Sequence, residues 1–155
     1  MGFEVRETGK TYAGAGLVVD NSVAMRWIIS SGKPADQRYA LNVRDYIQKE
    51  RARVMVPYLW TYEAANVAAY YVREGELGYS VALNALHALN DVFTISIDRG
   101  ETPQALFEAA ESRGVTAYDA SYLLLARAEG LPLATLDKKM RKVARGMGIY
   151  LFGSG

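Results

Sequence analysis

The sequence predicts an α/β domain in which a central parallel sheet of about five strands lies between two layers of helices. Short apolar runs rich in branched and aromatic residues recur along the chain, and each has the length of a buried strand. Helical patterns separate these runs, which is typical of right-handed crossovers between parallel strands. Half of the 155 residues are hydrophobic, which is enough for one substantial core.

The elements follow from the alternation of these patterns. Strands are predicted over residues 17–19, 54–56, 93–97, 132–136 and 149–152. Helices are predicted over residues 22–29, 36–51, 58–74, 79–90, 102–112, 117–129 and 138–146. We expect residues 17–152 to form one domain. The charged, glycine-rich residues 1–16 are expected to be an N-terminal extension, and residues 153–155 a flexible tail.

Composition excludes several classes of site. The chain has no cysteine, so disulfides, thiolate metal sites and cysteine nucleophiles are ruled out. No apolar stretch approaches the roughly 20 residues that span a bilayer. The first 16 residues lack the apolar centre of a signal peptide. These features lead us to expect a cytoplasmic protein.

Three aspartates directly follow predicted strands. They are Asp20, Asp98 and Asp137. In an open parallel sheet, functional groups gather beyond the carboxyl ends of the strands. For Asp20 there is a structural alternative, because Asp is also a preferred N-cap residue and a helix is predicted to begin beside it. Position alone therefore does not assign Asp20 to a site.

Two further carboxylates lie on apolar helix faces. Helical spacing surrounds Glu63 with Leu59, Trp60 and Val67, and it surrounds Asp119 with Tyr122, Leu123 and Ala126. No lysine or arginine shares either face, so burial of these charges is costly without a partner. The structural alternatives are a hydrogen bond to a neighbouring helix end for Glu63 and a role in the first helical turn for Asp119.

The four acids Asp20, Glu63, Asp119 and Asp137 converge if the strands at 17–19 and 132–136 are neighbours. Carboxylates at close range repel one another unless a cation neutralises them. Mg²⁺ or Mn²⁺ suits such oxygen ligands, and it can activate water and stabilise charge on a phosphodiester. These residues therefore favour a metal-dependent hydrolytic site.

Three segments carry a family resemblance. "LVVDNSVAMRW", "PYLWTYEAANVAAYYV" and "TAYDASYLLLARAEGLPLATLDKKMRKVARGMGIYLF", in this order and spacing, resemble a PIN domain, and the closest branch is the VapC-like toxin ribonucleases. The resemblance covers residues 17 to 152. It implies an α/β/α sandwich with adjacent first and fourth strands, an acidic Mg²⁺ or Mn²⁺ site, and endonucleolytic cleavage of RNA.

The resemblance also assigns roles to individual residues. It implies that the catalytic and metal-binding acids are Asp20, Glu63, Asp119 and Asp137. Ser22 and Thr135 match small hydroxyl positions beside these acids and are expected to support them. Asn66 also matches a polar position of the family, with helix packing as the alternative role. Asp98 has no counterpart in the set, because the third strand is expected at a sheet edge.

Partners are implied by the same resemblance. VapC-like proteins form homodimers and are inhibited by a small VapB-like antitoxin. Aromatic residues that offer material for an interface include Trp27, Tyr70, Tyr71 and Tyr79, although such spacing is also typical of a core.

The sequence does not separate a toxin from an RNA-processing nuclease. A non-catalytic RNA-binding or scaffold domain of the same fold is disfavoured, because all four acids are present.

An alternative hypothesis is an enzyme that transfers phosphate through an aspartyl phosphate on Asp20, and the sequence disfavours it. Haloacid-dehalogenase-like enzymes require an acid two residues later, where this chain has Ser22, and receiver domains require a late lysine that Thr135-Leu136-Asp137 does not supply. The single histidine, His87, lies among alanines and leucines and is interpreted as a packing or surface residue.

A basic run begins directly after Asp137. Residues 138–145 contain no acid and five cations, which are Lys138, Lys139, Arg141, Lys142 and Arg145. A run of this kind is often a solvated helix face. The alternative is a basic rim that binds the RNA backbone beside the acidic site, while Met140 and Ala144 turn inward.

Overall fold

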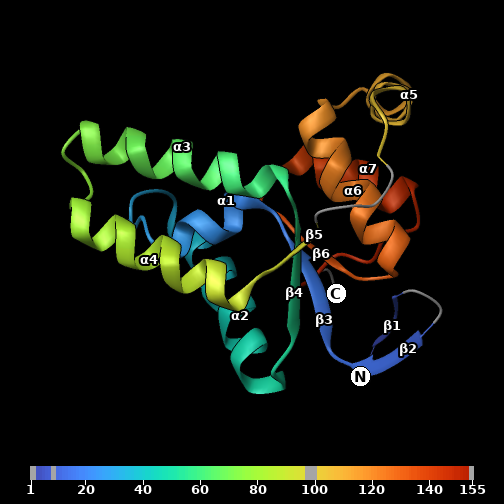
Figure 1. Ribbon diagram of the computed structural model, residues 1–155, viewed down its shortest axis with the longest axis horizontal. Coiled ribbons are helices and arrows are strands. Elements are labelled where there is room, and N and C mark those ends of the chain that lie inside the picture. The colour runs from blue at the N-terminus through green and yellow to red at the C-terminus, as the bar shows by residue number, and fades with distance from the viewer. Residues whose placement is uncertain (1–2, 8–9, 97–100, 154–155) are drawn as a thin grey trace.

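The computed structural model describes residues 3–7, 10–96 and 101–153, and Figure 1 shows its helices and strands. The central sheet is parallel and has the strand order β5–β4–β3–β6. Its strands are β3 (Gly16–Val19), β4 (Arg53–Pro57), β5 (Thr94–Ser96) and β6 (Leu133–Ala134). Val18 pairs with Leu133 and Val19 with Ala134, so the prediction that the first and last of these strands are neighbours is confirmed.

The fifth predicted strand is reduced to one bridge. Leu151 pairs with Leu133 in parallel, and Leu133 exchanges two backbone hydrogen bonds with Tyr150 and Phe152. The chain then turns at Gly153, which has a φ of +72°. The apolar run at 149–152 therefore lies beside β6, as a fifth strand would, without extending the ladder.

Helices cover both faces of the sheet, which confirms the predicted sandwich. Figure 1 shows α1 to α4 on one side and α5 to α7 on the other. The first group comprises α1 (Asn21–Ala24), the 3₁₀ helix η1 (Met25–Trp27), α2 (Pro34–Glu50), α3 (Leu59–Arg73) and α4 (Tyr79–Val92). The second comprises α5 (Pro103–Arg113), α6 (Ala117–Glu129) and α7 (Lys138–Gly146). Asp98 lies outside the described residues.

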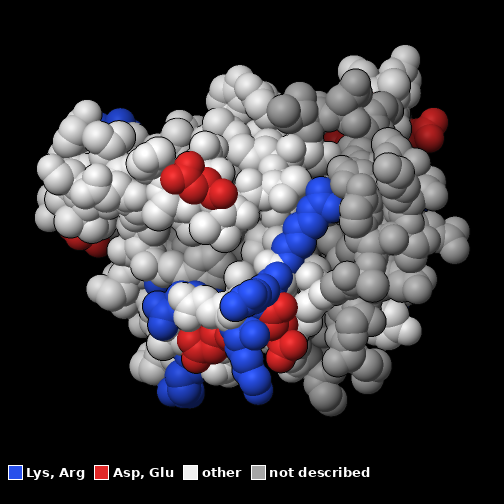
Figure 2. Space-filling model, turned by 60° about the horizontal axis from the view of Figure 1, so that its bottom comes forward, with Lys and Arg blue, Asp and Glu red and all other residues white. Residues whose placement is uncertain are grey.

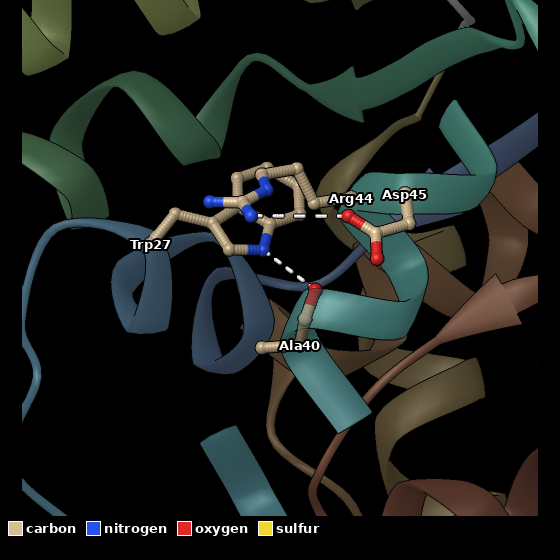
Figure 3. Close-up of polar contacts among 4 residues, drawn as sticks. All are labelled: Trp27, Ala40, Arg44 and Asp45. Carbon is tan, nitrogen blue, oxygen red and sulfur yellow. Dashed lines mark hydrogen bonds and ion pairs between the residues drawn. The ribbon is translucent and has the colours of Figure 1, made fainter. Parts of the chain in front are cut away.

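The first predicted helix is divided in the structure. The pattern over residues 22–29 indicates one helix, but α1 ends at Ala24 and the chain tightens into η1. The indole N–H of Trp27 donates to the backbone carbonyl of Ala40 at 2.8 Å, which fixes η1 against α2 (Figure 3). An exposed ion pair, Arg44–Asp45 at 3.8 Å, lies on α2 in the same view.

The segment expected as an N-terminal extension contains regular structure. β1 (Phe3–Glu7) and β2 (Lys10–Gly14) pair antiparallel and form a sheet separate from the central one. The chain passes from β2 to β3 through Ala15 alone. The hairpin thus leads directly into the central strand. The last two residues, 154–155, lie outside the described part of the chain.

The core surrounds β3. Leu17, Val18 and Val19 are fully buried because strands flank them on both sides and helices cover both faces. Burial of one such side chain contributes about 1.5–3 kcal/mol. The strand that leads into Asp20 is therefore among the most firmly held parts of the molecule.

Among the residues described, no helix combines the length and the apolar character that crossing a membrane requires.

Candidate functional site

Asp20 directly follows β3, and only 7% of its surface is exposed. It occupies the N-cap position of α1, where its backbone carbonyl accepts hydrogen bonds from the N–H groups of Val23 and Ala24. Its side chain makes no capping hydrogen bond. The carboxylate of Asp20 is therefore directed to other partners, and helix capping does not explain its presence.

Two hydroxyl groups hold this carboxylate. Ser22 Oγ and Thr135 Oγ1 both donate to Oδ2 of Asp20, at 2.7 and 2.8 Å. Each hydroxyl also accepts a backbone N–H, from Leu136 at 3.2 Å and from Asp137 at 3.1 Å respectively. Since these N–H groups occupy an acceptor position, the hydroxyl protons are directed to Asp20. Both fall on the same oxygen, which leaves Oδ1 without a hydroxyl donor among the described residues.

Glu63 is half-buried on α3, and a side chain of another helix holds it. The phenolic O–H of Tyr122 on α6 donates to its Oε1 at 2.7 Å. Tyr122 is 1% exposed, so the bond is anchored in the core. If Glu63 had only a structural role, we would expect it to bond to a neighbouring helix end. Its observed partner is instead the side chain of Tyr122, within α6.

Asp119 lies in the first turn of α6. Thr116 is the N-cap, and its hydroxyl accepts the backbone N–H of Asp119 at 3.0 Å. This bond fixes the backbone of Asp119 and leaves its carboxylate half-buried. The first-turn role expected as an alternative is therefore present, but it concerns the backbone of the residue and not its carboxylate.

The three acids interact electrostatically. Burial raises the pKa of Asp20, opposed by the hydrogen bonds from Ser22 and Thr135, and the charge of Asp119 raises it further. Burial likewise raises the pKa of Glu63; the bond from Tyr122 opposes this, and the charges of Asp20 and Asp119 add to the rise. Among the described residues, no lysine or arginine contributes to either shift.

Asp137 is placed differently. It is exposed, and its Oδ1 accepts the backbone N–H of Met140 at 2.8 Å as the N-cap of α7. It is not among the charges that act on Asp20 or Glu63. Its link to the other acids runs through its backbone N–H, which donates to Thr135. The structure thus brings three of the four predicted acids into one electrostatic group and leaves the fourth at the edge.

The sequence pattern of the PIN domain family matches residues 17–146, the segment that contains all four acids. The chain belongs to the PIN domain family. Exonuclease VapC9 from Pyrobaculum aerophilum is 30% identical over 98 residues, which cover 63% of this chain and 72% of the relative. This PIN domain is therefore VapC-like.

A solved structure has the same fold. The crystal structure of PAE2754 from Pyrobaculum aerophilum aligns with a TM-score of 0.64 at 24% identity, over 85% of this chain and 81% of the other. At this identity the similarity concerns the arrangement of helices and strands.

The acids of this PIN domain suit a hard cation. Proteins of the family generally depend on a divalent metal ion. Within the described ranges, no three acidic or histidine side chains are arranged as a ready-made metal cluster. Mg²⁺ needs only one or two carboxylates, because water and substrate oxygens complete its shell. Asp20 and Glu63 are the candidates for such ligands, because their pKa values are raised and no lysine or arginine among the described residues contributes to either shift.

The basic run divides into two parts. Lys138, Lys139, Lys142 and Arg145 are exposed on α7, while Met140 and Ala144 are buried as predicted. Arg141 is half-buried and donates to the carbonyl of Thr135 at 3.1 Å and to the hydroxyl of Tyr39 at 3.5 Å. Its guanidinium also lies over the Tyr39 ring, 5.5 Å from the centroid. Arg141 therefore joins α7 to α2 through Tyr39.

Other predicted residues are placed as follows. Asn66 is exposed on α3, one turn after Glu63, and His87 is exposed on α4, 3.9 Å from Asp91. Tyr70 and Tyr79 are exposed, whereas Trp27 and Tyr71 pack against the core. Figure 2 shows the molecule with the bottom of Figure 1 turned forward, and on this face basic and acidic side chains lie next to one another.

Two residues that contact the site or its support are not singled out by the sequence pattern. The pattern places Tyr122 on the apolar face beside Asp119 and gives no sign of the contact between Tyr39 and Arg141. Spacing does contain the signal for Tyr122, because it lies three residues after Asp119 and shares its helix face. The contact with Glu63 joins residues 59 positions apart, and no local pattern indicates it.

Proposed function

We propose that this PIN domain is a metal-dependent endoribonuclease that hydrolyses RNA phosphodiester bonds. The observation that carries the proposal is the group formed by Asp20, Glu63 and Asp119. The pKa values of Asp20 and Glu63 are raised, and the charge of Asp119 adds to both rises, as expected for a site that a cation would stabilise. The family supports the same reading, since the relative Exonuclease VapC9 is named as a nuclease.

The residues of the chain have distinct parts in the proposed reaction. Asp20 and Glu63 hold Mg²⁺ or Mn²⁺, with Asp119 and Asp137 completing the acidic surroundings. When bound, the cation supplies a water of lowered pKa and neutralises charge on the phosphodiester. Ser22 and Thr135 keep the Asp20 carboxylate in one orientation. Asn66, exposed on α3 one turn after Glu63, offers a further polar group.

The primary test compares the unaltered protein with Asp20→Asn on defined RNAs, with and without Mg²⁺. We expect cleavage that requires the metal and that falls at least about a hundredfold in the variant, because even groups outside the ligand shell typically contribute 10–100-fold. Asp45→Asn, an exposed aspartate on α2, is the matched control and should retain activity. Metal-independent cleavage would contradict the proposal.

A second test separates internal cleavage from attack at an end. The named relative is an exonuclease, whereas we propose an endonuclease. A circular RNA has no ends, so only an endonuclease converts it to a linear product. If the linear RNA is cleaved while the circular RNA stays intact, the protein is an exonuclease and not an endonuclease.

The biological role proposed is that of the toxin of a VapBC-type pair in the cytoplasm. The VapC relative supports this role, and a small VapB-like antitoxin would then inhibit the enzyme. Co-expression with the product of an adjacent reading frame should relieve growth arrest and yield a complex on purification. Normal growth on expression of the PIN domain alone would favour an RNA-processing role.

We further propose that the protein is a homodimer. Support comes from α3 and α4, which Figure 1 shows extending away from the sheet as a pair. Large apolar side chains are exposed on them, including Tyr62, Tyr70, Tyr79, Val81 and Leu83. A second copy is a suitable partner, because this surface carries few charges that would require a complementary one.

A further inference from the structure

The phenol of Tyr122 lies where three elements of the acidic site meet. Tyr122 belongs to α6, one turn after Asp119, and its hydroxyl donates to Oε1 of Glu63 on α3 at 2.7 Å. The charge of Asp20 and the backbone N–H of Asn21, the next residue, both influence the pKa of this phenol, so the start of α1 lies close to it. One hydroxyl group thus connects the elements that carry Asp20, Glu63 and Asp119.

This hydroxyl is a fixed donor. Tyr122 is 1% exposed, and its phenolic O–H points at Oε1 of Glu63 at 2.7 Å. The ring is set in the core, whereas Glu63 is half-buried and has three rotatable side-chain bonds. The hydrogen bond therefore restricts the glutamate more than the tyrosine.

Asp20 and Glu63 share a pattern of bonding. In each, the protein's hydroxyl donors bind one carboxylate oxygen: Oδ2 of Asp20 receives Ser22 and Thr135, and Oε1 of Glu63 receives Tyr122. The second oxygen of each carboxylate receives no hydroxyl from the described residues. Hydroxyl groups thus orient each carboxylate through a single oxygen.

We propose that Tyr122 is a positioning residue, whose hydroxyl holds the Glu63 carboxylate in place to bind the divalent cation together with Asp20. This inference rests on the proposed function, because it concerns the metal site of that enzyme. Groups that hydrogen-bond to metal ligands fix their orientation, and their loss typically weakens metal binding 10–100-fold.

The test measures Mn²⁺ binding to the full chain by calorimetry, without RNA. We compare the unaltered protein, Tyr122→Phe, Glu63→Gln and the double variant. Tyr122→Phe removes only the hydroxyl and should weaken Mn²⁺ binding by roughly tenfold. In the Glu63→Gln background the same change should have no further effect, because the carboxylate that it positions is absent.

Other results overturn the inference. An unchanged affinity in Tyr122→Phe, or an equal loss in both backgrounds, would mean that the tyrosine acts only through packing. Tyr150→Phe, which changes an exposed tyrosine, is the matched control and should bind Mn²⁺ normally. If the unaltered protein binds no Mn²⁺, the proposed metal site itself fails, a result distinct from a failure of the positioning role.

A second measurement does not require Tyr122→Phe to fold. In protein labelled with 3-fluorotyrosine, Glu63→Gln should displace the fluorine resonance of the tyrosine that contacts Glu63, which identifies Tyr122. Mg²⁺ should then shift this resonance in the unaltered protein and leave it in place in Glu63→Gln. An unmoved resonance at Mg²⁺ concentrations that calorimetry shows to be saturating would overturn the inference.

Discussion

At the scale of single residues, hydroxyl groups orient the carboxylates of the site. Thr135 is fully buried, and its one hydroxyl donates to Asp20 while accepting the backbone N–H of Asp137. It therefore connects the carboxylate after β3 with the start of α7. Thr135 and Ser22 were predicted as supporting positions from the family resemblance, and the structure supplies the contacts through which such support would act.

Thr135→Val tests this connection, because valine has the same shape and lacks the hydroxyl. The change leaves the N–H of Asp137 without its partner, which should cost about 1–3 kcal/mol of unfolding free energy. It also removes one donor from Asp20, so RNA cleavage should fall roughly tenfold or more. Urea denaturation and cleavage rates measure the two effects. A stable and fully active variant would contradict the connection.

The raised pKa values predict how the metal-free protein responds to pH. Their ordinary values are 3.8 for Asp20 and 4.5 for Glu63, and both are higher in the folded state. The folded protein therefore binds protons more tightly than the unfolded chain. The contribution of these two groups to stability is therefore greatest below their ordinary pKa values and is lost as pH rises through the raised ones.

Asp20→Asn should accordingly stabilise the metal-free protein at neutral pH and should make its melting temperature less dependent on pH. The comparison uses thermal melts in a chelator at about pH 5 and about pH 7. A variant that melts lower at neutral pH, with the same pH dependence, would give Asp20 a structural role instead.

At the scale of elements, α7 depends on Asp137 as its N-cap. Asparagine caps as well as aspartate, whereas alanine costs about 1 kcal/mol. Asp137→Asn should therefore keep the melting temperature of the unaltered protein while most RNA cleavage is lost. Asp137→Ala should lose RNA cleavage and also melt at a lower temperature. Activity retained in Asp137→Asn would restrict this residue to capping.

The exposed cations of α7 provide a second prediction at this scale. Lys138→Ala with Lys142→Ala should weaken RNA binding broadly across sequences, because such residues contact phosphates. The logarithmic dependence of binding on salt should become shallower by roughly 0.7 for each phosphate that the variant no longer neutralises. Lys33→Ala with Lys49→Ala, two exposed lysines of the α2 region, is the matched control. Equal salt slopes in all three proteins would make the run an ordinary solvated face.

Arg141 belongs to the same run but should behave differently. Because it contacts Thr135 and Tyr39, its replacement would disturb the packing of α7, so it is left unchanged in this experiment.

The elements themselves were largely predictable from the sequence. Glycine and proline punctuation and apolar spacing located α6 at 117–129 and α7 at 138–146 without error. The prediction was inaccurate where tertiary contacts decide. α1 gives way to η1 where Trp27 packs on α2, and the run at 149–152 has only Leu133 as its ladder partner among the described residues. The contacts of Tyr122 and Arg141 were missed because both join elements that are distant in sequence.

At the scale of the whole molecule, α3 and α4 form a surface that a single copy leaves open. A pocket of about 550 Å³ lies between them, lined mainly by apolar groups that include Trp60, Ala64, Leu83 and Leu86. Aromatic and apolar side chains of this kind are enriched at the centres of interfaces.

We predict a dimer at micromolar concentration, and Leu83→Glu should convert it to a monomer, since a charge would be buried without a partner. Light scattering measures the mass. Phe107→Glu, the same kind of change on the exposed face of α5, should remain dimeric. A monomer in the unaltered protein would refute the dimer.

The pairing of β3 with β6 also bears on the order in which the protein is made. The hydrogen bond between Asp20 and Thr135 joins residues 115 positions apart, and Glu63 meets Tyr122 across 59. A ribosome releases the N-terminal part first, so Asp20 emerges long before the groups that orient it. A partly translated chain therefore carries no assembled site. If the proposed RNA cleavage holds, we expect the nascent chain to be inactive until β6 and α7 have left the ribosome, because Thr135 and Asp137 are made after Asp20 and Glu63.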